Sequence, residues 1–176
     1  ACDVEHADHD GSSTPDQVYR YFSMLMDAIP QPEKHLAHFH TTRGWGLANV
    51  LAALQAGVCV FESTLGGLGG QPANFMDDCP IPGTGNYYYK DPNSVGLVNT
   101  EDMVLMMEEM GIETGIDVDR ILRLGTLFER TIGRRLRSDA IHHGRIPKAA
   151  NESYKRAGLK DRKAKLGEAL GQRFPE

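Results

Sequence analysis

The chain has 176 residues, of which 40% are hydrophobic and 24% are charged, as is typical of one globular domain. Its net charge of −5 argues against a general nucleic-acid-binding role, and no apolar run reaches the ~20 residues of a membrane span. The sequence shows no leading basic stretch followed by an apolar segment, so we expect no signal peptide. The three cysteines, Cys2, Cys59 and Cys79, lack metal-type spacing, so we expect free thiols in a reducing compartment and a cytoplasmic protein.

The charge divides the chain into two parts. Residues 145–176 contain nine lysines and arginines against four acidic residues, so residues 1–144 carry a large acidic excess. We therefore expect a basic helical tail over 145–176 after a folded part over 1–144. The tail is either a solvated helical segment or a docking element for a partner chain or a phosphate-bearing ligand.

Helical and strand-like segments alternate along the first part, which predicts an α/β fold. A Ser-Ser-Thr-Pro run at 12–15 predicts the start of a helix that ends at about residue 28. A buried strand is expected over 35–40, a helix over 44–56 and a second strand over 58–61.

A long glycine-containing loop over 63–94 precedes a short strand over 95–98. Asn99 is expected to cap a helix over 103–110, and Asp117 a further helix that ends at Gly133. We expect the apolar side chains of that last helix to face the core: Ile121, Leu124, Leu127, Phe128 and Ile132. A closed (β/α)₈ barrel needs at least ~200 residues, so the chain is either a smaller fold or the C-terminal half of something larger.

His38 and His40 are the clearest sign of a metal site. In a strand, residues i and i+2 point to the same face, so the two imidazoles can reach one divalent ion. The pair lies at the C-terminal end of a strand that precedes a helix, where α/β barrels place active-site groups. Two ligands do not complete a site, and we expect oxygen donors in addition.

The glycine-rich run Gly66-Gly67-Leu68-Gly69-Gly70 follows the next strand. Such a run allows a close approach of backbone to ligand or a hinged lid, and a plain flexible loop is the alternative. Its spacing fits neither a Walker loop nor a dinucleotide fingerprint.

Several segments together resemble the 3-hydroxy-3-methylglutaryl-CoA lyase family. Residues 38–58, beginning His-Phe-His-Thr-Thr-Arg-Gly, resemble its sixth strand and helix, and residues 63–72, Ser-Thr-Leu-Gly-Gly-Leu-Gly-Gly-Gln-Pro, resemble its signature loop. The Thr-Glu-Asp run at 100–102, with residues 110–115, is similar to its eighth unit. Asp8 and the Thr-Pro pair at 14–15 are similar to the end of its fifth strand. The resemblance covers about residues 3–145 in colinear order.

The resemblance implies the C-terminal portion of a (β/α)₈ TIM barrel, about strands 5–8, with appended C-terminal helices. It implies a lyase that cleaves a 3-hydroxyacyl-CoA to acetyl-CoA and a keto acid by a retro-Claisen reaction, with Mg²⁺ or Mn²⁺ held by His38 and His40. Two alternatives remain: a Claisen-condensing enzyme of the isopropylmalate or citramalate synthase type, and a non-catalytic barrel subunit.

The chain departs from the family pattern in its proton donor and in a metal ligand. Gln71 stands where the loop cysteine belongs, and an amide is not a useful acid. Cys79, in an apparent insertion over 73–94, is the candidate catalytic replacement. Leu97 stands where the family has a metal-binding asparagine, which Asn86 or Asn99 could replace. The family's first-strand Arg-Asp motif is absent, together with that half of the barrel.

The same resemblance places the substrate at Gly69, Gly70, Gln71 and Asp8. We expect an acyl-CoA substrate, no nucleic acid and no membrane. Because a half-barrel exposes unpaired strand edges, we also expect an oligomer, in which the missing N-terminal half or another protein chain completes the barrel.

Overall fold

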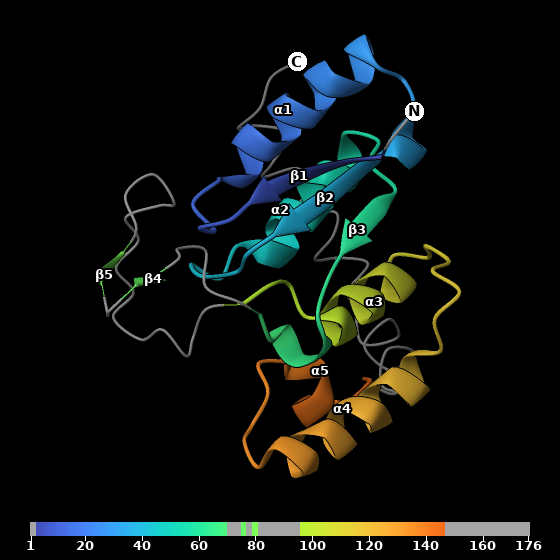
Figure 1. Ribbon diagram of the computed structural model, residues 1–176. Helices are drawn as coiled ribbons and strands as arrows, with labels where there is room; N and C mark the ends of the chain where they lie inside the picture. Colours follow the sequence, from blue (N-terminus) through green and yellow to red (C-terminus); the bar gives the residue numbers. More distant parts are fainter. Residues whose placement is uncertain (1–2, 70–74, 77–78, 81–95, 147–176) are drawn as a thin grey trace, which may run out of the picture. The chain divides into compact units, whose positions relative to one another are not determined.

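The computed structural model describes residues 3–69, 75–76, 79–80 and 96–146. Its main sheet has three parallel strands in the order β1 (Val4–Asp8), β2 (His35–Phe39) and β3 (Val60–Glu62), which lie side by side in Figure 1. Helix α1 (Pro15–Ala28) connects β1 to β2, and α2 (Gly46–Gln55) connects β2 to β3. These strand–helix–strand units confirm the α/β fold.

The remaining described elements are short or follow the sheet in sequence. They are η1 (Pro32–Lys34), η2 (Leu65–Gly67), the two-residue strands β4 (Phe75–Met76) and β5 (Cys79–Pro80), α3 (Thr100–Glu109), α4 (Val118–Ile132) and α5 (Asp139–His143). Within the described ranges, no helix combines the length and the apolar character needed to cross a membrane.

The helix boundaries follow from the capping residues. Thr14 and Gln17 form a capping box before α1. The side chains of Asn99 and Asp117 accept hydrogen bonds from backbone N–H groups in the first turns of α3 and α4. Gly133 ends α4 at φ 69°, a left-handed conformation that favours glycine. The expected helix starts and stops are confirmed here, although α3 begins three residues earlier than expected.

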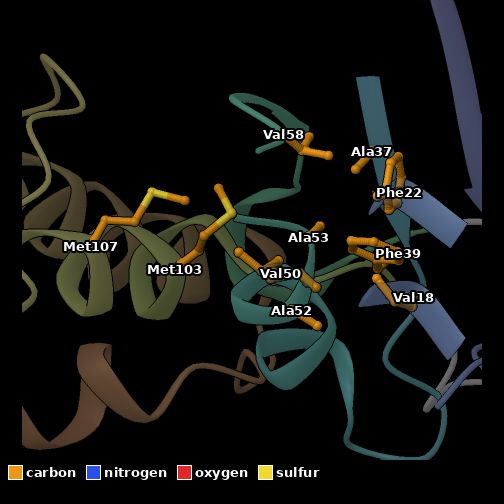
Figure 2. Packing of buried hydrophobic residues seen from close by; sticks show 11 residues of the cluster. Val18, Phe22, Ala37, Phe39, Val50, Ala52, Ala53, Val58, Met103 and Met107 are labelled. Atoms are coloured by element: carbon orange, nitrogen blue, oxygen red, sulfur yellow. The ribbon is translucent and has the colours of Figure 1, made fainter. Parts of the chain in front are cut away.

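The core lies where three helices meet one face of the sheet. Figure 2 shows Phe22 of α1 near Ala37 and Phe39 of β2, with side chains of α2 and α3 extending the same cluster. The cluster consists of these buried side chains: Val18, Phe22, Ala37, Phe39, Val50, Ala52, Ala53, Val58, Val98, Met103 and Met107. Because Ala37 and Phe39 face the helices, strand alternation turns His38 to the opposite face.

A buried carboxylate joins the start of α3 to the glycine-rich run. Glu101 is fully buried, and its Oε1 and Oε2 lie 3.0 and 2.9 Å from the backbone N–H of Gly66, which donates to them. Burial raises the pKa of Glu101. This contact holds η2 against the first turn of α3.

Two sequence expectations about side-chain burial and strand position were wrong. Leu124 and Leu127 are 48% and 58% exposed rather than facing the core. Helix α4 instead buries Val118 and Gly125, because Gly125 lies directly against the side chains of Ile141 and Glu101. The strand expected over 58–61 begins two residues later, at Val60.

The chain divides into two compact units, Ala1–His142 and His143–Glu176. Most of the second unit, residues 147–176, lies outside the described residues. The basic helical tail expected over 145–176 therefore stays a prediction.

Candidate metal centre

The face of the sheet opposite the core carries titratable side chains. Register pairs Ala7 of β1 with His38 of β2, and His38 with Glu62 of β3. Since parallel partners point to the same face, His38 lies between neighbours from both adjacent strands. The result is a polar face near the carboxyl ends of the strands.

His38 is held by acidic neighbours on one of its two nitrogens. Its Nδ1 lies 2.8 Å from Oε2 of Glu62, to which it donates a hydrogen bond, and 3.1 Å from Oε1 of Glu5. A carboxylate on one imidazole nitrogen fixes the tautomer and leaves the lone pair on the other nitrogen. His38 therefore offers Nε2.

His40 follows β2 and is 5% exposed. Burial, followed by the nearby His38 and His9, lowers the pKa of His40 to about 4. Its imidazole is therefore neutral at pH 7 and retains a lone pair. The backbone of His40 forms an isolated antiparallel β-bridge with Leu97. The Leu97 side chain has no atom that could bind an ion.

The two histidines fit a divalent cation. His38 Nε2 and His40 Nδ1 are buried and have no hydrogen-bond partner among the described residues. A buried nitrogen without a partner costs about 1–3 kcal/mol, so an electrophile bound to both lone pairs would remove that cost. The rings lie 5.2 Å apart between centroids.

A third histidine, His9, joins this pair and was missed in the sequence. It follows β1, its ring centroid lies 5.8 Å from that of His38 and 6.2 Å from that of His40, and one nitrogen from each of the three lies within 4.8 Å of the others. The strand register is the signal that could have found it, because Ala7 pairs with His38 and residue i+2 of each strand shares its face.

Asp8 lies at the end of β1 and is 8% exposed. Its carboxylate accepts hydrogen bonds from the backbone N–H groups of Ser12 and Ser13 at 3.2 and 3.3 Å. Burial and the adjacent Asp10 raise the pKa of Asp8. In the structure Asp8 organises the loop that follows β1; its predicted contact with substrate remains a prediction.

The glycine-rich run lies against the segment that precedes α3. Gly66 and Gly67 have φ values of 62° and 67°, and a Cβ added to Gly69 would meet Leu97 at 2.7 Å. These contacts account for glycine at all three positions by backbone conformation and close packing. Gly69 is placed beside Leu97, which in turn is bridged to His40.

Several predicted site residues are not placed beside the histidines. Gly70, Gln71 and Asn86 lie outside the described residues. Cys79 is in β5, where its backbone pairs with Met76, and its side chain lies outside what the structure describes. Their predicted roles remain predictions.

Asn99 has its polar atoms engaged elsewhere. Its Oδ1 accepts from the backbone N–H of Asp102 at 2.8 Å, and its Nδ2 donates to the Asp102 carboxylate and to the Arg137 carbonyl. The helix-cap role considered for Asn99 is therefore the one that the structure shows.

Comparisons with known proteins agree with the fold and with these motifs. A family described as HMGL-like matches residues 1–128. The chain is 36% identical over 128 residues to a hydroxymethylglutaryl-CoA lyase of Bacillus subtilis, covering 73% of this chain and 37% of that protein. It is 34% identical over 130 residues to the (R)-citramalyl-CoA lyase of Chloroflexus aurantiacus, covering 74% and 35%.

A solved structure of an HMG-CoA lyase is also similar to this chain in fold. An HMG-CoA lyase from Acinetobacter baumannii, in complex with coenzyme A and 3-methylmalate, superposes with a TM-score of 0.66 at 36% identity. The match covers 82% of this chain and 44% of that one, so the chain spans less than half the length of its relatives. The fold of a TIM-barrel portion is thus confirmed, its assignment to about strands 5–8 stays a prediction, and the chain belongs to the HMGL-like family.

Proposed function

We propose that the protein acts as a metal-dependent carbon–carbon lyase that cleaves a 3-hydroxyacyl-CoA to acetyl-CoA and a keto acid. The observation that carries the proposal is that one buried nitrogen each of His38 and His40 has no hydrogen-bond partner in the described part of a chain of this family. Relatives named as lyases of hydroxymethylglutaryl-CoA and of (R)-citramalyl-CoA support a hydroxylated acyl-CoA as substrate.

His38 and His40 would hold the cation. When bound, Mg²⁺ or Mn²⁺ would polarise the C3 hydroxyl of the substrate and favour its deprotonation. Glu62 holds the proton on Nδ1 of His38, so that Nε2 is available as a ligand. The shift of the His40 pKa to about 4 keeps that ring unprotonated at neutral pH.

The cleavage step needs a general acid. The C3 hydroxyl gives its proton to water and its oxygen becomes the carbonyl of the keto acid, while the C2–C3 bond breaks and leaves its electron pair on the thioester fragment as an enolate. Protonation of the enolate carbon completes acetyl-CoA. Cys79 is the candidate proton donor, because Gln71 stands at the position of the family's loop cysteine.

The rest of the proposal concerns assembly. The strands that would complete the barrel come from another segment or another chain, and the assembled protein is an oligomer in the cytoplasm. The parallel sheet supports this, since β1 has only β2 as a strand neighbour among the described residues. Gly69, Gly70, Gln71 and Asp8 are proposed to contact the acyl-CoA.

The test is cleavage of 3-hydroxy-3-methylglutaryl-CoA and citramalyl-CoA by the assembled protein, with acetyl-CoA release measured before and after chelation. We expect chelation to abolish turnover and added Mn²⁺ to restore it. The His38→Ala/His40→Ala double variant should lose both Mn²⁺ binding and turnover, whereas His143→Ala should lose neither. Full Mn²⁺ binding by the double variant would contradict the metal assignment.

The two alternatives give different outcomes in the same assay. A condensing enzyme would consume acetyl-CoA and a keto acid and leave the acyl-CoA substrates intact. A non-catalytic subunit would bind the metal and turn over neither pair of compounds.

A further inference from the structure

The polar face of the sheet brings three imidazoles together. His9 reaches His38 and His40 because β1 and β2 are parallel neighbours whose paired register ends at Asp8 and Phe39, directly before His9 and His40. One nitrogen of each ring lies within 4.8 Å of the others. Two nitrogens that bind one ion at about 2.1 Å each are at most about 4.2 Å apart, so small rotations of these side chains would bring all three within reach of a single ion.

The two buried imidazole nitrogens without a partner among the described residues are not the nitrogen that contacts the carboxylates. His38 donates from Nδ1 to Glu62 and keeps Nε2, while His40 keeps Nδ1. Glu5 and Glu62 approach His38 on Nδ1, and their side chains are 50% and 46% exposed. Glu5, His38 and Glu62 form a second group close enough to hold an ion. Because both carboxylates lie on Nδ1 of His38, they leave Nε2 to the three-histidine group and orient that ring.

The Asp10 carboxylate is the charged oxygen group near His40 among the described residues. Its Oδ1 accepts hydrogen bonds from the backbone N–H and the hydroxyl of Ser12, and the three imidazole nitrogens gather without it. The bridge partner of His40 is Leu97, an aliphatic residue, and Asn99 uses its amide on Asp102 and Arg137. Mg²⁺ prefers oxygen ligands, whereas imidazole suits Zn²⁺ and the other late first-row ions. A set of three imidazoles consequently selects against Mg²⁺.

We propose that His9 is the third protein ligand of this centre and that the three-histidine set makes it a site for Zn²⁺, Co²⁺ or Ni²⁺ rather than for Mg²⁺. The inference rests on the metal site of the proposed function and changes its expected ion. His9 is exposed while His40 is buried, so His9 closes the site from the solvent side.

The experiment is calorimetric titration of the chelator-stripped, assembled protein with ZnCl₂, MnCl₂ and MgCl₂. We expect the wild type to bind Zn²⁺ more tightly than Mg²⁺. Loss of a partner that merely orients a ligand costs 10–100-fold in affinity, so His9→Ala should weaken Zn²⁺ binding by at least about tenfold. His143→Ala is the matched control and should bind Zn²⁺ as the wild type does.

Co²⁺ gives a readout that does not depend on turnover. Its visible absorption depends on the number and type of ligands, so His9→Ala should change the spectrum and His143→Ala should not. The thermal midpoint measured in chelator checks that each variant is folded. His9→Gln, which keeps a polar side chain of similar reach, serves as a second variant and should behave like His9→Ala toward Zn²⁺.

The outcomes separate this inference from the proposed function. Zn²⁺ affinity and Co²⁺ spectra within twofold of wild type in both His9 variants would overturn the third ligand while leaving a His38–His40 site intact. Tighter binding of Mg²⁺ than of Zn²⁺ would overturn the ion class. Unchanged Zn²⁺ binding by the His38→Ala/His40→Ala variant would overturn both proposals.

Discussion

Glu62 on β3 accepts a hydrogen bond from Nδ1 of His38 on β2 at 2.8 Å, across a pair of residues that the strand register also joins. The contact orients the imidazole and makes its other nitrogen more basic. We expect Glu62→Gln to weaken metal binding by about 10–100-fold, measured by titration of the chelator-stripped protein. Glu33→Gln, at an exposed site in η1, is the control, and equal affinities in the two variants would argue against this role of Glu62.

Cys79 is the predicted general acid. Removing a general acid typically lowers a rate by ~10²–10⁴-fold, so Cys79→Ser should reduce kcat by at least about tenfold while metal affinity is unchanged. Cys59→Ser is the matched control, because Cys59 is a free thiol in the segment before β3. A Cys79→Ser turnover within twofold of wild type would assign the proton transfer to another group.

The open edge of β1 predicts association. Among the described residues its only strand neighbour is β2, and Val4 on this strand is 48% exposed. Unpaired backbone groups and apolar side chains at one edge favour pairing with further strands. We expect sedimentation analysis of the isolated chain to show oligomers or aggregates, and a monodisperse 19.4 kDa species with one cooperative unfolding transition would contradict the half-barrel.

Glu101 should contribute differently to stability at low and neutral pH. Burial raises the pKa of Glu101 in the folded state above its value in the unfolded chain. Glu101 therefore contributes its full stability below the unfolded-state pKa of about 4.5, where it is protonated in both states. That contribution is lost as the pH rises through the folded-state pKa. Glu101→Gln removes this titration, so the difference in free energy of unfolding, variant minus wild type, should increase with pH in a series of urea titrations. A difference that is constant with pH would contradict this account.

The same carboxylate also satisfies the Gly66 N–H. Glu101→Ala leaves that buried donor without a partner and should cost about 1–3 kcal/mol of stability. Glu108→Ala, on the same helix, is the control. Urea unfolding of the three proteins at one pH above neutrality compares these costs.

Local sequence signals predicted the helix caps well, and they placed His38 and His40 on one face of the sheet, where the two rings lie close together. Thr14, Asn99, Asp117 and Gly133 each act through neighbours a few residues away, so their roles can be recognised from spacing alone. His38 and His40 share a strand and therefore a face. In each case the interacting groups are close in sequence.

Tertiary arrangement decided the features that were missed. His9 is distant from His38 in sequence and becomes its neighbour only through the register of β1 and β2. Helix α4 has the expected apolar stripe, but the helix packs through the face that carries Gly125, which lies against the side chains of Ile141 and Glu101. Leu124 and Leu127 are therefore left exposed. Neither the register nor the side of a helix that packs is determined by periodicity.

Gly96 has a consequence for how this chain tolerates mutation. A Cβ at that position would lie far inside the van der Waals contact distance to the Gly67 carbonyl oxygen. The Gly96 carbonyl also accepts a hydrogen bond from the backbone N–H of Thr41, next to His40. Any side chain there would force the glycine-rich turn away from the strand end that carries the histidines. In a saturation library selected for metal binding, position 96 should therefore be as depleted of substitutions as the histidines, although glycine has no side chain with which to bind an ion.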